Sequence, residues 1–256
     1  MLIHASDNKG NPVPLSAAVL QVYADKQPVQ IDELKPANQV PVRFVLLLDL
    51  SGSNKDKIEF EKKAAAQIFE ALSKGSNQGY FGWFNDKVAI SRQPLSVPVL
   101  NSFLARDIKP QGGTVLYDAI RQACAQPLSR TNNNPLFRRV LFLISDGEDD
   151  ASYTTESQAE QIAEGEGVAV FALTLVGTSG ANRGKRALQR LAQNTGGNVV
   201  VLNGPGQYLH KLLDPLQGQY LLTFTPPEAK KGSIQRLEVK SSDRSIEVFA
   251  PAGYSR

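Results

Sequence analysis

The stretch at residues 44–53 reads Phe-Val-Leu-Leu-Leu-Asp-Leu-Ser-Gly-Ser, and it decides the fold. Its first five residues form a continuous apolar run without polar alternation, which is typical of a strand buried on both faces in a parallel sheet. The run stops at the carboxylate of Asp49, and the hydroxyls of Ser51 and Ser53 follow. In open α/β sheets, ligands bind at the carboxyl ends of the strands. These three side chains are therefore expected where such a fold keeps its site.

A carboxylate with two hydroxyls is a hard-oxygen donor set, which suits Mg²⁺ or Mn²⁺ and suits zinc or copper poorly. Two later segments add donors of the same kind: Gly112-Gly113-Thr114, and the run at residues 140–144, which again stops before a carboxylate. We predict that the three segments converge at one edge of the sheet. The candidate metal ligands are Asp49, Ser51, Ser53, Thr114 and Asp146.

Each of these segments alone also fits a local structural role. Asp49 fits a helix N-cap, Thr114 fits a cap for the helix that follows it, and Asp146 with Gly147 fits an ordinary turn. The metal hypothesis depends on all three segments occurring together, each in the expected strand or loop context.

Strands and helices are expected to alternate from residue 40 to residue 217. This alternation predicts an α/β fold with a doubly wound, mostly parallel sheet covered by helices on both faces. Apolar spacing predicts helices from residue 58 to near 75 and over 99–108, 116–126, 155–166, 184–194 and 208–216. Strands are expected at 80–84, 140–144, 168–173 and 198–201, with an antiparallel edge strand starting at 88–90.

Both ends of the chain are β-rich, which suggests three parts: residues 1–39, 40–217 and 218–256. Residues 19–23 and 29–31 are expected to form a hairpin, and residues 220–224, 236–240 and 245–249 to form strands. The terminal strands either extend the central sheet or pair with each other in a small accessory β-sheet. We favour the accessory sheet, because strands from the two ends could pair and bury an apolar face.

Composition excludes several classes of function. The net charge of +3 is too small to indicate nucleic-acid binding, and no apolar run approaches the ~20 residues of a membrane span. The N-terminus lacks a signal-peptide pattern, and Cys124 is the only cysteine. The two histidines, His4 and His210, lie far in sequence from the candidate ligands, which argues against a Ser-His-Asp triad.

The order and spacing of Asp-x-Ser-x-Ser at residues 49–53, Gly112-Gly113-Thr114 and the segment at 145–149 resemble the von Willebrand factor type A domain over about residues 40–217. The resemblance implies a metal-ion-dependent adhesion site. It implies direct metal ligation by Ser51, Ser53 and Thr114, with Asp49 and Asp146 acting partly through bound water. It also implies that an Asp or Glu of a protein partner completes the coordination.

A narrower likeness covers almost the whole chain. Residues 7–13, 22–28, 219–222 and 252–254, in this order around the A domain, resemble bacterial von Willebrand factor A-related proteins abundant in acidobacteria. That family implies an exported or surface-anchored protein, with a cytoplasmic location left open as the alternative. This chain departs from the family pattern at Asp25-Lys26-Gln27, which replaces an Asp-Gly turn, and in a compressed connection over residues 14–19.

The sequence thus favours a non-enzymatic, divalent-metal-dependent module that binds a protein carboxylate. One alternative is a metal-dependent phosphoesterase, for which Asp149 is the only nearby candidate base. The other alternative is a scaffold in which the ion only stabilises the fold.

Overall fold

In the computed structural model, residues 44–49 form most of strand β5 (Val42–Asp49), which lies inside a six-stranded sheet. The strand order is β10-β9-β8-β5-β6-β7, and every pair is parallel except β6 with β7 at the edge, as predicted. The structure describes residues 1–8, 11–129, 137–175, 182–202, 208–228 and 234–255. The other strands of this sheet are β6 (Gln78–Phe84), β7 (Val88–Ile90), β8 (Arg138–Ile144), β9 (Val168–Leu175) and β10 (Asn198–Leu202).

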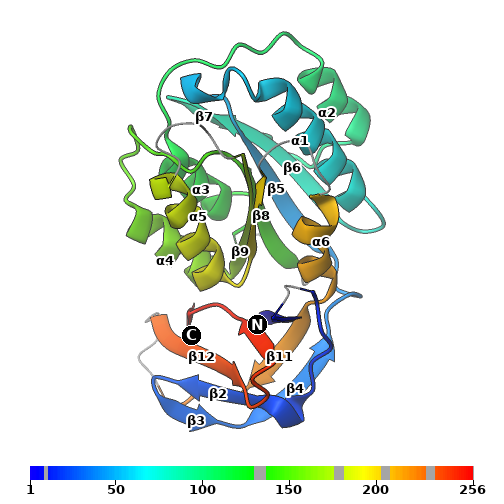
Figure 1. The fold of residues 1–256 in the computed structure, drawn as a ribbon, viewed down its shortest axis with the longest axis vertical. Coiled ribbons are helices and arrows are strands. Elements are labelled where there is room, and N and C mark those ends of the chain that lie inside the picture. The colour runs from blue at the N-terminus through cyan, green and yellow to red at the C-terminus, as the bar shows by residue number, and fades with distance from the viewer. Residues whose placement is uncertain (9–10, 130–136, 176–181, 203–207, 229–233, 256) are drawn as a thin grey trace.

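Helices cover both faces of this sheet (Figure 1). One face carries α1 (Ile58–Leu72), α2 (Val97–Leu104) and α6 (Leu209–Gln217). The other carries α3 (Leu116–Ala125), α4 (Glu156–Glu166) and α5 (Asn182–Thr195). This arrangement confirms the predicted doubly wound fold. Among the described helices, none is both long and apolar enough to cross a membrane.

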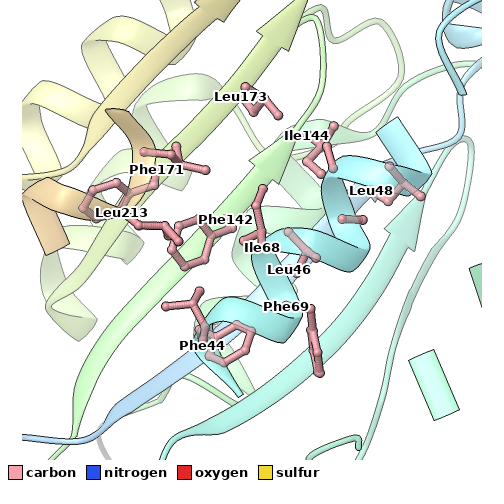
Figure 2. Packing of buried hydrophobic residues seen from close by; sticks show 14 of the residues in the cluster. Phe44, Leu46, Leu48, Ile68, Phe69, Phe142, Ile144, Phe171, Leu173 and Leu213 are labelled. Carbon is pink, nitrogen blue, oxygen red and sulfur yellow. The ribbon is translucent and has the colours of Figure 1, made fainter. Parts of the chain in front are cut away.

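The apolar run of β5 supplies both faces of the core, because successive side chains of a strand point in opposite directions. Phe44, Leu46 and Leu48 pack with α1 and α6, whereas Val45 and Leu47 pack with α3 and α4. Figure 2 shows the first set beneath Ile68 and Phe69 of α1. A strand buried on both faces cannot slip by one residue without burying a mismatched set of side chains, so the position of Asp49 at its end is well defined.

Two helix boundaries illustrate how local sequence sets the elements. Helix α4 begins with a capping box between Thr155 and Gln158 and ends at Gly167, which adopts the left-handed conformation at φ 65°. Its predicted range is confirmed. The predicted range of α2, 99–108, is wrong at both ends, since the helix begins at Val97 and ends at Leu104. Pro98 lies in its first turn, a position that suits the fixed φ of proline.

Strands from the two ends of the chain pair with each other, as expected, but they form two sheets. One has the order β13-β1-β11-β4 and the other β14-β12-β2-β3. Apolar side chains of both sheets form one cluster that includes Ile3, Leu222 and Leu237. Figure 1 shows these strands below the α/β part. The strands are β1 (Leu2–Asp7), β2 (Leu20–Ala24), β3 (Gln27–Val29), β4 (Ile31–Pro36), β11 (Tyr220–Phe224), β12 (Ile234–Ser241), β13 (Ile246–Phe249) and β14 (Gly253–Ser255).

The N-terminal hairpin is tighter than predicted. Strand β2 pairs directly with β3 around Asp25 and Lys26, which have φ of 46° and 67°. Two successive residues with positive φ are typical of the type I′ turns that match the twist of a hairpin. Ile31, which was expected in this hairpin, instead begins β4 in the other sheet.

Arg138 joins the two parts at the base of β8. Its buried guanidinium donates to the carbonyl oxygens of Val40 (2.9 Å) and Leu216 (2.6 Å) and to the side chain of Gln219 (3.4 Å). Val40 and Leu216 lie where the chain enters and leaves the α/β part. One side chain thus holds both connections between the two parts.

Candidate metal centre

The ends of β5 and β8 bring two of the three predicted segments together. These strands are adjacent and parallel, and Leu48 pairs with Ile144 in their register. Asp49 and Ser145 therefore leave the sheet side by side. Since carboxyl ends of parallel strands meet at one edge, segments separated by more than 90 residues share one site.

Asp49 is fully buried, and both of its carboxylate oxygens accept hydrogen bonds. Oδ1 accepts from the backbone N–H of Ser51 (2.9 Å), and Oδ2 accepts from the hydroxyl of Ser145 (2.6 Å). Burial raises the pKa of Asp49 to about 6, against the opposing effect of these hydrogen bonds. A nearby cation would compensate this buried charge.

A chain of side-chain contacts continues from the first segment to the third. The hydroxyl oxygens of Ser51 and Ser53 lie 3.1 Å apart, and the Ser53 hydroxyl donates to Oδ2 of Asp146 (3.0 Å). The other oxygen of Asp146 accepts from the N–H of Glu148 (3.1 Å). Four of the five predicted ligands, with Ser145, thus belong to one network of oxygens.

Thr114 reaches the site on a neighbouring loop. The N–H of Gly52 donates to the carbonyl of Gly112 (3.1 Å), so this loop lies directly against the first segment. Gly112 has φ +82°, a conformation that favours glycine. The hydroxyl of Thr114 forms no hydrogen bond with any described residue, and Thr114 is 5% exposed.

The alternative that Thr114 caps the next helix is wrong. The N-cap of α3 is Val115, and that helix has no side-chain cap. Instead, the backbone of Thr114 is held by the third segment, since its N–H donates to Oδ1 of Asp150 (2.7 Å) and its carbonyl accepts from the N–H of Asp150 (3.2 Å). Asp49 and Asp146 do accept local backbone hydrogen bonds typical of turns, alongside their contacts across the site.

The acidic residues after Asp146 form hydrogen bonds with neighbouring segments. Glu148 accepts from the N–H of Gly184 (3.2 Å). Asp149 accepts from the N–H of Tyr117 (3.2 Å) and from the hydroxyl of Ser152 (2.5 Å). Together with Asp150, these side chains fix the β8–α4 loop against neighbouring loops and helices.

The structure itself also indicates that these oxygens suit a hard divalent ion. In the described part of the chain, neither Asp49 nor Asp146 forms an ion pair with a basic side chain. Two buried oxygens, Oε2 of Glu61 and Oδ1 of Asn54, also have no hydrogen-bond partner among the described residues. If an ion binds, the hydroxyls and carboxylates named above would hold it, and it would supply a Lewis-acidic position for an anionic oxygen.

Sequence reasoning missed Ser145, Asn54 and Glu61. Ser145 precedes a predicted ligand, so its hydroxyl was a visible signal. Glu61 is one of the buried residues of α1, at 3% exposed. A charged residue next to a position on the buried stripe was the available signal.

The fold and this arrangement of loops define a von Willebrand factor A-type module. A sequence model of the von Willebrand factor type A domain matches residues 44–214, more than half of the chain. The chain therefore belongs to the von Willebrand factor type A domain family. No curated protein matches the sequence.

Solved structures share the fold at low identity. BatB, a conserved hypothetical protein from Bacteroides thetaiotaomicron, has a TM-score of 0.54 and 16% identity over 68% of this chain and 97% of its own. A von Willebrand factor type A protein from Catenulispora acidiphila has a TM-score of 0.55 and 11% identity, over 93% of this chain and 74% of its own. Proximal thread matrix protein 1 from the mussel byssus, with a zinc-occupied MIDAS motif, has a TM-score of 0.53 and 20% identity, over 68% of this chain and 46% of its own. The likeness to acidobacterial proteins stays a prediction.

Proposed function

We propose that this chain is a divalent-metal-dependent protein-binding module of the adhesion type. Mg²⁺ or Mn²⁺ binds among Asp49, Ser51, Ser53, Thr114 and Asp146, and a Glu or Asp side chain of a protein partner completes the coordination. The direct ligands would be three neutral hydroxyls, with the two carboxylates acting partly through bound water, so an open coordination position attracts an anionic oxygen.

One observation carries this proposal: the Ser53 hydroxyl lies 3.0 Å from the carboxylate of Asp146, at the carboxyl ends of two adjacent parallel strands. The zinc-occupied MIDAS motif of the mussel protein supports metal binding by this type of site. The choice of Mg²⁺ or Mn²⁺ is supported by the donor atoms, which are hydroxyl and carboxylate oxygens.

A non-enzymatic role is supported by the surroundings of the site. Asp149, the residue on which a phosphoesterase mechanism would depend, has both carboxylate oxygens engaged by Tyr117 and Ser152. His4 is buried among the terminal strands, stacked on Phe249, and His210 lies on α6. Neither provides a base for metal-bound water.

Two related proposals concern the whole chain. We assign the binding function to residues 40–217, with residues 1–39 and 218–256 as a supporting unit whose strands pair with each other. The likeness to exported bacterial proteins supports an extracytoplasmic location.

The test uses matched small carboxylate and amide probes. N-acetyl-glutamate amide and N-acetyl-glutamine amide are titrated into isotope-labelled protein with Mg²⁺, and chemical shifts are followed by NMR. We expect shifts near residues 51–53 and 112–114 with the carboxylate probe, and their loss in EDTA and in Asp49→Asn. If the metal-loaded protein shows no chemical-shift change with either probe, the alternative of a scaffold stabilised by its ion is favoured instead.

A further inference from the structure

Two polar side chains beside the candidate metal site each have one buried oxygen without a hydrogen-bond partner among the described residues. Glu61, on α1, is 3% exposed, and Asn54, in the short 3₁₀ helix Gly52–Asn54, is fully buried. Oε2 of Glu61 and Oδ1 of Asn54 form no hydrogen bond with described residues. Buried polar atoms are nearly always paired with protein or with ordered water, so each of these two requires an explanation.

Both side chains lie near the metal site. The amide of Asn54 approaches the carbonyl oxygen of Asp49 (3.4 Å). Residues 54, 57 and 61 are linked by successive backbone hydrogen bonds, which place Asn54 and Glu61 two turns apart along the same segment. Asp49 on β5 and Asp146 in the β8–α4 loop both act electrostatically on the Glu61 carboxyl, as does Lys57 with the opposite sign.

Burial raises the pKa of Glu61 to about 9, and the two aspartates reinforce the effect. At neutral pH in the metal-free protein, the side chain is therefore a neutral carboxylic acid that can both donate and accept a hydrogen bond. Burying it without a partner lowers the stability of the fold. The neighbouring buried positions of α1, such as Ile58, Ala65 and Ile68, are apolar. An apolar residue would serve packing better at position 61.

Because Glu61 is buried near the site with an unpaired oxygen, we propose that it is a positioning residue for the metal. Together with Asn54 it holds water of the ion's coordination shell behind Asp49. This inference rests on the proposed metal-binding function. Partners of this kind orient the groups that contact a metal, and their loss typically lowers metal affinity.

Three variants separate this role from simple burial of a carboxyl. Glu61→Leu removes the polar group, and Glu61→Gln keeps a neutral group of the same shape that can donate and accept. Glu164→Leu is the matched control, because Glu164 is also buried (9% exposed) and its pKa is raised by burial to about 7, but it lies on α4 near the base of the sheet. Each full-length protein is titrated with Mn²⁺ alone by calorimetry, and its melting temperature is measured in EDTA.

We expect Glu61→Leu to raise the melting temperature in EDTA and to weaken Mn²⁺ binding by about 10–100-fold. Glu61→Gln should keep an affinity close to that of wild type, and Glu164→Leu should change stability alone. If Glu61→Leu does not fold, Glu61→Met serves as the apolar variant. Unchanged affinity in the apolar variant overturns this inference alone, as does an equal loss in Glu61→Gln. Failure of the wild type to bind Mn²⁺ overturns the proposed function as well.

Discussion

The hydroxyl of Ser53 donates to Oδ2 of Asp146 at 3.0 Å, which joins the loops after β5 and β8 across 93 positions of sequence. Both loops follow fully buried strands, so neither can shift without disturbing the core. A small hydroxyl and a carboxylate held in this way form a rigid part of the candidate metal site.

Ser53→Ala should weaken metal binding with little change in fold stability. The hydroxyl is one of the proposed ligands, whereas its contact with Asp146 is exposed and contributes about 1 kcal/mol or less. Calorimetric titration with Mg²⁺ and urea denaturation measure the two effects separately. Ser102→Ala, which removes an exposed hydroxyl on α2, is the control. A Ser53→Ala protein with wild-type affinity would remove Ser53 from the ligand set.

Glu61 should make the metal-free protein less stable as pH rises. Its pKa is raised from 4.5 to about 9, so between these values the folded state holds the proton more tightly than the unfolded chain. The cost of burying this carboxyl is smallest below pH 4.5, where both states are protonated, and it grows as pH rises to about 9, where the folded state also loses the proton. In EDTA, Glu61→Gln should flatten the fall of melting temperature over this range.

Two other buried carboxyls act in the same direction, since the pKa values of Asp49 and Glu164 are raised to about 6 and about 7. Both remain in Glu61→Gln, so the difference between the two melting curves reports Glu61. Parallel curves for wild type and variant would show that Glu61 titrates normally.

Arg138→Met should destabilise the whole chain by about 2–4 kcal/mol, because hydrogen bonds from charged donors contribute more than neutral ones and the buried acceptors would be left unpaired. The guanidinium stays charged at neutral pH even though burial lowers its pKa to about 10. Urea denaturation gives the loss, with the exposed Arg92→Met as control. If both variants lose the same small amount of unfolding free energy, strand pairing alone holds the connections between the α/β part and the terminal strands.

Lys26→Gly should stabilise the protein by about 0.5–1 kcal/mol. Lys26 has φ 67°, a conformation that costs a side chain about 1–2 kcal/mol and glycine almost nothing, although glycine also loses more chain entropy on folding. Lys26→Ala also removes the long side chain, but alanine keeps the strain at positive φ. This variant should therefore not be more stable than wild type. Thermal unfolding of the two variants distinguishes backbone strain from side-chain effects.

Long apolar runs made the central sheet predictable. A continuous apolar run such as residues 44–48 can be buried on both faces only in the interior of a sheet covered by helices. The helices carry clear capping signals, such as Thr155 and Gly167 at the two ends of α4. The terminal strands were harder, because their alternating patterns do not specify partners. Their division into two sheets depends on pairings such as β1 with β13 and β2 with β12, which join opposite ends of the chain.

The convergence of Asp49, Ser51, Ser53 and Asp146 was also predictable, since each lies at or after the end of a strand, whereas their role as metal ligands stays a prediction. The contacts of the residues around these ligands were not predictable. The role of Asp150 depends on a hydrogen bond to the backbone of Thr114, 36 residues away, which no local pattern encodes. The burial of Glu61 depends on the rotation of α1 against β5, which is a property of packing.

Calorimetric titration of Mg²⁺ and Mn²⁺ into wild type and Asp49→Asn tests the central claim most directly. Asp49→Asn keeps the shape of a fully buried side chain and removes its charge, and the exposed Asp107→Asn is the control. We predict saturable binding to wild type and to Asp107→Asn, with binding lost in Asp49→Asn. Equal binding of all three proteins, or of none, would contradict a metal centre at the ends of β5 and β8.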